Sequence, residues 1–433
     1  MKVPLQDFVP YPQSFKWQIH HQYYQSRGSQ AWLNQEVPCH ITSNYRAAWQ
    51  HAKIVYEILH EKHFSTTATV LEIGAGLGEF AIHFLNSFFE LCKTQQISFS
   101  IRYLFADFSR HTLQEASQNS FLKKFQDHGI LDFYVLDALS PETVQDLNGN
   151  FFDLKESSPI AIIENYLHCT LPLTILKKKN QVFLEKYLSL SYEADSEHTP
   201  REELRTLLLQ KATQAGILPS LQEEFDYRPA NLSDYLKHPL IQKTLEEMTE
   251  SLETATIIFP FGSIQHLQRF LPLLHPEGAL ILSDKGYPDA SWMKGEEEVY
   301  VQPSIHGNSL AHPVHFPLLE SCAKNMGYRT LRTTNRKYYL QSMIIFPLSA
   351  SLAREANFRE QFMNQNLNQE AELFWLKAFE EKQKKDGREA KALLLECLKY
   401  RAQDCCLFYE LGQLCLGLNE YIDALSYFQQ GAP

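Results

Sequence analysis

The sequence lacks the features that would place the protein in a membrane or on nucleic acid. No stretch approaches the run of about 18 uncharged apolar residues that a transmembrane helix needs, and Met1 to Pro12 contains no apolar core of a signal peptide. Basic residues are in deficit, with 40 Lys and Arg against 51 Asp and Glu. The net charge of −11 disfavours a general electrostatic attraction to phosphates. We therefore expect neither nucleic acid nor a membrane as a partner.

Disulfide and metal-binding patterns are also missing. The eight cysteines include no C-x-x-C pair and are scattered through apolar contexts, which is typical of buried thiols in a reducing cytoplasm. His312 and His315 lack the helical spacing and the acidic companion of a recognisable zinc site. The sequence therefore predicts a cytoplasmic protein without a metal site.

The 433 residues are enough for more than one domain, and the C-terminal part shows a repeat of 34 residues. The matching positions are Phe374 and Phe408, Ala378 and Gly412, Ala390 and Ala424, and Leu394 and Phe428. This period, with small and bulky residues at fixed places, predicts tetratricopeptide-like (TPR-like) helical repeats over 371–433. Two units rarely stand alone, so we expect them to dock on the preceding domain, another subunit or a protein partner. The alternative is an amphipathic helical hairpin repeated by chance.

Upstream of the repeats, short apolar runs alternate with helical patterns, as in an α/β domain with a mostly parallel sheet. An interruption between residues 163 and 256 exceeds an ordinary crossover connection and predicts an insertion at about 173–255. Its first part has a hairpin pattern and its second part is helical and charged. The expected strands are 68–73, 100–106, 131–136, 159–163, 256–259 and 279–283. The predicted organisation is a helical lead-in (1–40), a doubly wound α/β domain (41–348), a linker helix (349–370) and the repeats.

The most informative segment is 70–85, which has the pattern of a strand, a glycine-rich turn and a helix. Gly74, Gly76 and Gly78 let the backbone turn tightly and approach a ligand with no Cβ in the way. Glu79 stands where a dinucleotide fingerprint needs glycine, and its carboxylate would oppose a pyrophosphate. The turn therefore predicts a nucleotide-type cofactor other than NAD.

Three acids stand at the ends of the first three predicted strands. Glu72 suits the cationic amino-acid end of S-adenosyl-L-methionine (SAM), Asp107 suits a ribose diol and Asp137 suits an adenine amino group. Because carboxyl ends of parallel strands share one edge of a sheet, we expect a single cofactor crevice there. In the alternative interpretation the acids are solvated strand ends and the glycines form only a turn.

This combination resembles the class I SAM-dependent methyltransferases, whose motif is an acidic residue, one spacer and then Gly-x-Gly-x-Gly. It resembles more narrowly the MidA family, which includes the mitochondrial arginine methyltransferases that assist complex I assembly. The resemblance implies a Rossmann-like methyltransferase sheet over about 40–348 that binds SAM. It is carried by Ile41–Tyr45, Glu72–Gly78, Ile163–Pro172 and Ala279–Tyr287, with Ala311–Phe316 as a weaker fifth stretch.

The chain departs from that family at the end of its fourth strand. Aligned through Asn165, the family's Glu falls on Tyr166 and its Asp on Cys169. Glu164 stands where the family has a small residue. The resemblance therefore supports cofactor binding more strongly than it supports the chemistry of that family.

Methyl transfer needs a nucleophile held in line with the methyl group, and an arginine acceptor also needs a carboxylate to localise its charge. Glu164 and Asn165 are the nearest catalytic candidates, with Tyr166 and His168 just beyond. We expect the first three to face the methyl donor together. His168 has the chemistry of a base near neutral pH, although a lone histidine is more often structural. Asp284 is equally a turn residue or a substrate contact.

Three functions stay open from the sequence. The first is a methyltransferase that acts on a protein, with arginine implied by the resemblance, in which the insertion shapes the pocket and the repeats recruit the substrate. The second is a non-catalytic cofactor-binding adaptor, and the third is a small-molecule methyltransferase. The altered fourth strand favours the second and third, whereas the cofactor turn favours the first and third. A homo-oligomer is compatible with each of them.

Overall fold

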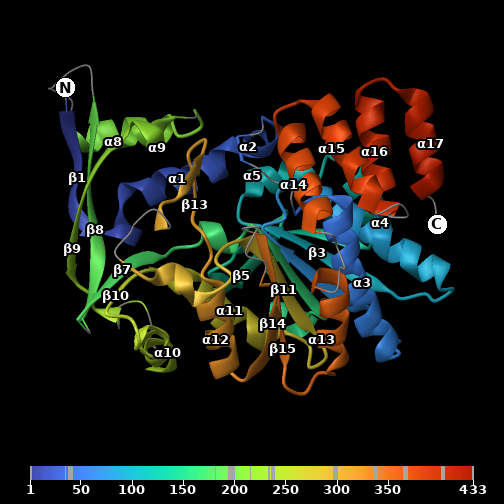
Figure 1. Ribbon diagram of the computed structural model, residues 1–433, viewed down its shortest axis with the longest axis horizontal. Coiled ribbons are helices and arrows are strands. Elements are labelled where there is room, and N and C mark those ends of the chain that lie inside the picture. Colours follow the sequence, from blue (N-terminus) through green and yellow to red (C-terminus); the bar gives the residue numbers. More distant parts are fainter. Residues whose placement is uncertain are drawn as a thin grey trace. The chain divides into compact units, whose positions relative to one another are not determined.

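The chain forms two compact units in the computed structural model (Figure 1). The first unit comprises Met1–Val37, Ser65–Leu77 and Ser100–Ser351, and the second comprises Pro38–Phe64, Gly78–Phe99 and Leu352–Pro433. Within the described ranges, none of the helices has the length and apolar character required to cross a membrane. The structure describes residues 2–34, 36–37, 42–180, 182–193, 200–214, 216–232, 235, 239–295, 301–334, 340–363, 369–400 and 405–431.

The first unit is built on an eight-stranded sheet with the order β14-β15-β11-β6-β2-β3-β4-β5. The five neighbours β11, β6, β2, β3 and β4 are parallel, and β15 and β5 run antiparallel to the strands beside them. Their apolar sequences suit central parallel strands. The strands are β2 (Ala68–Ile73), β3 (Ile101–Asp107), β4 (Leu131–Asp137), β5 (Ser140–Asp146), β6 (Ala161–Asn165), β11 (Ala279–Lys285), β14 (Tyr328–Arg332) and β15 (Leu340–Pro347).

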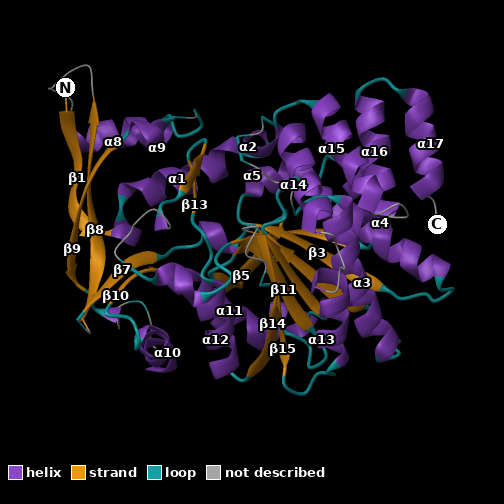
Figure 2. Ribbon diagram, viewed as in Figure 1, coloured by secondary structure: helices purple, strands orange, loops and turns teal. Residues whose placement is uncertain are grey.

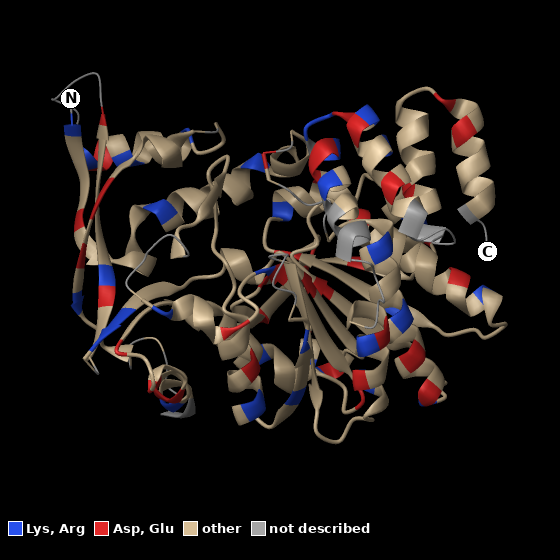
Figure 3. Ribbon diagram, in the orientation of Figure 1, with Lys and Arg blue, Asp and Glu red and all other residues tan. Residues whose placement is uncertain are grey.

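The strand order reverses direction between β2 and β6. Strands β3 and β4 follow on one side of β2, while β6 and β11 follow on the other. In such sheets ligands bind outside the carboxyl ends of the strands at this switch point. Acidic positions gather at one end of the sheet (Figure 3). The predicted mixed α/β class is therefore confirmed, and the topology places the expected cofactor strands next to the switch.

Apolar residues of two helices in the first unit pack with those of the sheet into one core. Leu71 and Ile162 of the strands share this core with Phe270 of α11 and with Phe316 and Leu319 of α12. Four short elements, η2, α5, α6 and α7, also lie in the connections between the strands of this sheet. The helices of these connections are α5 (Arg110–Ala116), α6 (Ser120–Asp127), α7 (Leu154–Ser157), η2 (His168–Thr170), α11 (Phe261–Phe270), η4 (Leu271–Leu273), η5 (Ala290–Met293) and α12 (Phe316–Asn325).

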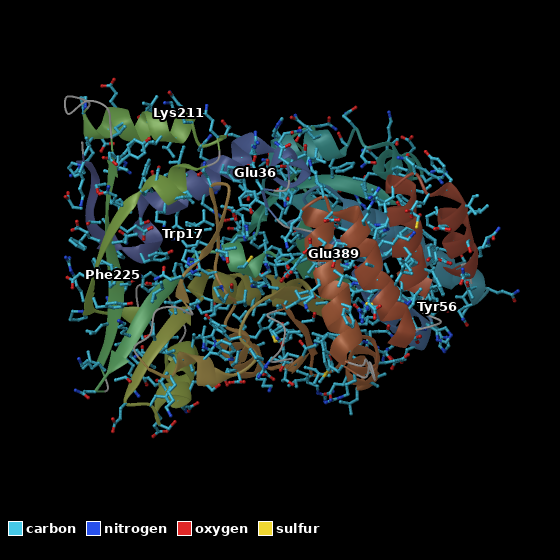
Figure 4. All side chains as sticks on the ribbon, turned by 45° about the horizontal axis from the view of Figure 1, so that its top comes forward. Trp17, Glu36, Tyr56, Lys211, Phe225 and Glu389 are labelled. Carbon is cyan, nitrogen blue, oxygen red and sulfur yellow. The ribbon has the colours of Figure 1, made fainter. Side chains whose placement is uncertain are left out.

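A second sheet of five strands also belongs to the first unit. Strand β8 pairs with β1, β7 and β9, and β10 pairs with β7. Figure 4 labels Trp17 of α1 and Phe225 of β9 in this region. The elements are β1 (Lys2–Pro10), η1 (Tyr11–Gln13), α1 (Phe15–Arg27), α2 (Gln30–Leu33), β7 (Thr174–Lys179), β8 (Val182–Glu193), α8 (Arg201–Gln210), α9 (Ile217–Ser220), β9 (Gln222–Pro229), α10 (Pro239–Thr249), β10 (Thr254–Phe259) and the hairpin β12 (Ser304–His306) and β13 (Ser309–Ala311).

This second sheet corrects three expectations. Residues 2–10 form strand β1 instead of part of a helical lead-in, because β8, far along the chain, supplies their ladder partners. Residues 256–259 were expected in the main sheet, yet they pair antiparallel with β7. The charged second part of the insertion contains β9 as well as helices. The hairpin predicted in the first part of the insertion is confirmed as β7 and β8.

All the regular secondary structure in the described residues of the second unit is helical (Figure 2). In the tail, α14 pairs with α15 and α16 pairs with α17. A Cβ added to Gly412 would come within 2.5 Å of the Phe428 ring, so this position needs the small residue that the repeat pattern placed there. The TPR identity of the tail stays a prediction. The helices are α3 (Tyr45–Glu61), α4 (Glu79–Thr94), α13 (Ala353–Phe358), η7 (Arg359–Met363), α14 (Gln369–Gln383), α15 (Gly387–Tyr400), α16 (Cys405–Gly417) and α17 (Tyr421–Gly431).

The tail helices of the second unit pack on α3. Tyr45 and Trp49 of α3 join the apolar cluster of the tail. The Tyr45 ring stacks on that of Tyr409 at a centroid distance of 4.7 Å, and the Arg46 guanidinium lies over the Trp375 ring at 5.2 Å. The tail therefore docks on helix α3, which precedes the glycine turn in the sequence.

Candidate functional site

The glycine turn has the backbone conformation that only glycine adopts easily. Gly74, Gly76 and Gly78 have φ values of 74°, 54° and 81°. The amides of Gly74 and Ala75 both donate to the carbonyl of Ala106, at 2.9 and 3.1 Å, and so tie the turn to the end of β3. Gly78 is the N-cap of α4. Each glycine of the motif is thus required by the turn itself.

Asp107, at the end of β3, holds the same turn. Its Oδ2 accepts from the Gly76 amide at 3.1 Å and its Oδ1 accepts from the Ser109 amide at 2.9 Å. Burial raises the pKa of this carboxyl, although the backbone amides oppose that effect. A carboxylate oxygen accepts more than one hydrogen bond, so Asp107 keeps capacity for the hydroxyls of a ribose.

Glu72, at the end of β2, is buried with a single hydrogen bond given by the structure. The Tyr103 hydroxyl donates to Glu72 Oε2 at 2.9 Å. Burial raises the pKa of Glu72 to about 8, with the hydrogen bond from Tyr103 acting in the opposite direction. The carboxyl therefore holds a proton at neutral pH until a cation approaches, as the amino-acid end of SAM would.

Asp137 lies apart from this buried arrangement. It ends β4 with an exposed side chain, and its Oδ1 accepts from the Leu139 amide at 2.8 Å in the turn that leads to β5. The structure thus shows a turn role for Asp137. Its predicted contact with an adenine amino group stays a prediction.

An aromatic group from the N-terminal helices lies beside the glycine turn. A Cβ built on Gly76 would lie 3.6 Å from the Trp32 ring. Tyr24 and Trp32 have ring centroids 5.7 Å apart, and Phe108 packs with both in one cluster. This contact was not predicted from the sequence, because it depends on tertiary packing.

Glu164, at the end of β6, is fully buried between two histidines. Its Oε2 lies 2.7 Å from His168 Nε2 and its Oε1 lies 2.6 Å from His266 Nε2. Burial alone would raise the pKa of Glu164, yet the charge and hydrogen bonds of the imidazoles lower it to about 2. The Nδ1 of His266 lies 2.7 Å from the Ala138 carbonyl, which only accepts. Both nitrogens of His266 therefore donate, which makes it an imidazolium paired with Glu164.

Glu164, His168 and His266 form one buried group, which the sequence did not predict. Their ligand atoms lie within 4.8 Å of one another, a spacing that can also hold a metal ion. Each imidazole, however, meets its own carboxylate oxygen at hydrogen-bond distance. His266 was missed because it lies 102 residues from Glu164 in a helical segment without a motif.

Strand register separates Glu164 from its neighbour Asn165. Glu72 is paired with Ile163 across β2 and β6, and Asn165 follows two residues later. Since side chains alternate along a strand, Glu72 and Asn165 lie on one face and Glu164 lies on the other. The expectation that Glu164 faces the methyl donor together with Asn165 is therefore corrected, because adjacent strand residues point to opposite faces.

Asn165 and Tyr166 form an unusual end to β6. Neither Oδ1 nor Nδ2 of Asn165 has a hydrogen-bond partner among the residues that the structure describes, and both atoms are buried. Tyr166 has a φ of 53°, the left-handed region that a tyrosine rarely adopts. Its amide donates to the Ser283 carbonyl at 3.0 Å, which fixes the bend.

Asp284 and His168 have structural partners. Asp284 accepts from the Cys169 amide at 2.9 Å and from the Lys285 amide at 2.7 Å, and burial raises its pKa to about 6. The Nε2 of His168 is bound to Glu164. Asp284 thus lies within β11 and binds backbone amides of the protein, and its predicted contact with a substrate and the predicted role of His168 as a base both stay predictions.

No protein-family model and no curated protein matches the chain. It is similar to two solved structures of COG1565 superfamily proteins from Burkholderia thailandensis, both at 12% identity. One covers 79% of this chain and 88% of that chain with a TM-score of 0.49. The other, bound to S-adenosyl-homocysteine, covers 78% and 88% with a TM-score of 0.48. The plantazolicin methyltransferase BpumL in complex with SAH shows 10% identity, coverage of 77% and 95%, and a TM-score of 0.33.

Proposed function

We propose that the protein is a SAM-dependent methyltransferase that acts on a nitrogen of a protein side chain. The observation that carries this proposal is the turn of Gly74 and Gly76, which Asp107 holds, together with the buried carboxyl of Glu72 on the same sheet edge just before the turn. A cationic, ribose-bearing cofactor matches these groups one by one. Two of the similar structures named above contain S-adenosyl-homocysteine (SAH), the product that remains when SAM has lost its methyl group.

In this proposal each group of the site has a distinct task. The glycine turn lets the backbone approach the cofactor, Asp107 binds the ribose hydroxyls and Glu72 pairs with the amino group of the methionine part. Glu164 acts as a positioning residue, because its two histidine partners tie the end of β6 to α11 and to the Ala138 carbonyl. Much of the rate acceleration in methyl transfer comes from holding donor and acceptor in line.

The acceptor is proposed to be part of a protein that the tail helps to recruit. Two paired helical hairpins offer a surface for a partner rather than chemistry. The resemblance to MidA proteins implies arginine as the acceptor. We also propose a cytoplasmic location, and a homo-oligomer is compatible with this function.

A non-catalytic SAM-binding adaptor is the second candidate. It is favoured by one observation, the full engagement of Glu164 and Asp284 by groups of the protein itself. Incubation with methyl-labelled SAM and cell lysate separates the two candidates. Label on protein supports the enzyme, whereas tight SAM binding without any transfer supports the adaptor.

Cofactor binding is tested by titration calorimetry of the full chain with SAH. Removing a hydrogen bond to a charged group costs about 1.5–3 kcal/mol, so Asp107→Ala should weaken SAH binding by about tenfold or more. Asp226→Ala, on exposed strand β9, is the matched control and should bind SAH as the wild type does. Absence of heat with SAH and with SAM, on protein shown to be folded by circular dichroism, would refute the proposal.

A further inference from the structure

Asn165 presents a carboxamide that the protein itself does not satisfy. Both polar atoms are shielded from solvent, and neither has a partner among the described residues. Leaving a buried donor or acceptor unpaired is unfavourable, and most buried polar groups in folded proteins are paired. The residue as a whole is only partly buried, so the chain at Asn165 borders the surface. Two unpaired, buried polar atoms on the same side chain point to a ligand.

The position of Asn165 connects it with the proposed methyl donor. It lies on the same face of the sheet as Glu72, at the switch point between β2 and β6. The left-handed backbone of Tyr166 directly after it ends the strand with a strained bend. Strained residues of this kind concentrate at ligand sites, where the surrounding structure holds them in place.

The charges around Asn165 disfavour a guanidinium acceptor. Glu164 has both oxygens bound to imidazoles, and Asp284, which directly follows the register partner of Asn165 on β11, accepts two backbone amides. The ammonium of Lys285 lies 5.8 Å from the centroid of the Tyr166 ring and adds positive charge. A guanidinium also carries donors only, so it would leave the Asn165 amino group without an acceptor.

From these observations we infer that the acceptor nitrogen belongs to a carboxamide, the group found in glutamine and asparagine side chains. A carboxamide offers an N–H and a carbonyl side by side. Asn165 Oδ1 accepts from that N–H while Asn165 Nδ2 donates to the carbonyl, so both unpaired atoms are satisfied in one contact. This inference rests on the proposed methyltransferase function and names the class of its acceptor.

The step balances without a further reactant. The amide nitrogen attacks the methyl carbon, the N–C bond forms as the C–S bond breaks, and the bonding pair of the C–S bond stays on sulfur. SAM thereby becomes the neutral thioether SAH, and the proton of the attacking nitrogen passes to solvent. Asn165 acts by orienting the nitrogen in line with the methyl group.

The test measures the binding of two small probes, propionamide and N-ethylguanidinium, to the protein–SAH complex by ligand-observed NMR. The wild type should bind propionamide at least about tenfold more tightly than N-ethylguanidinium, because a site built for hydrogen bonds rejects groups that leave it unpaired. Asn165→Asp keeps the shape but can only accept, so its preference should invert toward the guanidinium. Asn148→Asp, on an exposed turn, is the control and should keep the wild-type preference.

The outcomes separate this inference from the proposed function. If SAH binds but propionamide does not, or if N-ethylguanidinium binds as tightly, the carboxamide inference is wrong while cofactor binding stands. An unchanged preference in Asn165→Asp also overturns the inference, provided that calorimetry shows intact SAH binding. Failure of the wild type to bind SAH removes the proposed function itself. Mass spectrometry of lysate proteins after methyl transfer adds an independent readout, with methylated glutamine or asparagine expected and methylated arginine contrary to the inference.

Discussion

Glu72 and Glu164 stand at the ends of adjacent strands, both buried, and they are opposite in their chemistry. Glu72 has one hydrogen bond from Tyr103, and burial raises its pKa to about 8. Glu164 has an imidazole on each oxygen, and its pKa falls to about 2 despite burial. Two glutamates in the same type of position therefore differ. Glu72, on one face of the sheet, is a protonated carboxyl with one hydrogen bond given by the structure, whereas Glu164, on the other face, is a carboxylate with a histidine at each oxygen.

The difference shows how a sheet can carry a ligand face and a supporting face at one edge. A buried carboxyl with spare capacity destabilises the free protein but gains a partner when a cation binds. A buried carboxylate with all its partners present within the protein contributes to the fold, and its loss leaves those partners unpaired. Glu72 is of the first kind and Glu164 is of the second, while Asn165, on the face of Glu72, is a buried carboxamide that also lacks partners among the described residues.

The largest effect is expected from breaking the supporting face. Glu164→Ala removes the partner of two buried histidines, and losing one member of a buried charged group destabilises by about 3–5 kcal/mol. Urea unfolding at pH 7, followed by circular dichroism, measures this loss. Glu246→Ala, an exposed carboxylate of α10, is the control and should change the free energy of unfolding by less than about 0.5 kcal/mol. A loss as small for Glu164→Ala would show that its histidines do not depend on it.

The wild-type dependence on pH should be opposite for the two glutamates. The ordinary pKa of a glutamate is 4.5. Between pH 4.5 and about 8 the folded protein keeps a proton on Glu72 that the unfolded chain releases, so this group lowers stability as pH rises. The folded pKa of Glu164 is depressed, so its contribution is present above pH 4.5 and is lost as pH falls toward 2.

Glu72→Gln sharpens the comparison, because it removes the titration while it keeps the shape. The variant should be more stable than the wild type at pH 8, on the order of 2 kcal/mol, and the gain should shrink toward pH 5. It should also bind SAH about tenfold more weakly, since the ammonium loses its carboxylate. Urea unfolding at both pH values and calorimetry with SAH measure the two effects. A stability gain that does not change with pH would contradict the assigned titration of Glu72.

The parts of this arrangement that sequence could predict are those carried by neighbouring residues. The conformation of the turn could be predicted from Gly74, Gly76 and Gly78, because glycine tolerates positive φ. Glu72 and Asp107 follow from the placement of the turn and of the next strand, since carboxyl ends of parallel strands share an edge. Most of the central strands could likewise be predicted from their own residues, because both faces of such strands need apolar side chains.

The parts that sequence could not predict depend on partners that are distant along the chain. His266 reaches Glu164 across 102 residues. Strand β1 finds β8 through pairs such as Lys2 and Glu193. Neither partner carries a motif, and strand register, which separates Asn165 from Glu164, becomes visible only once β2 and β6 are aligned. The surroundings of Glu164 and Asn165 were therefore harder to predict than the glycine turn.

The smallest effect is expected from Tyr103→Phe, which removes the hydrogen bond to Glu72 and leaves the ring in place. That bond lowers the pKa of Glu72, so its loss should raise the pKa further and make the charged form harder to reach. A hydrogen bond is worth about 0.5–1.5 kcal/mol, and SAH affinity at pH 7 should fall by about two- to tenfold. The difference from the wild type should narrow at pH 9, where Glu72 loses its proton more readily in both proteins. Tyr134→Phe removes a hydroxyl that accepts from Arg102 and should leave SAH affinity unchanged. If the deficit of Tyr103→Phe is equal at pH 7 and pH 9, the hydroxyl acts through the shape of the β2 end, and the proton on Glu72 does not govern cofactor binding.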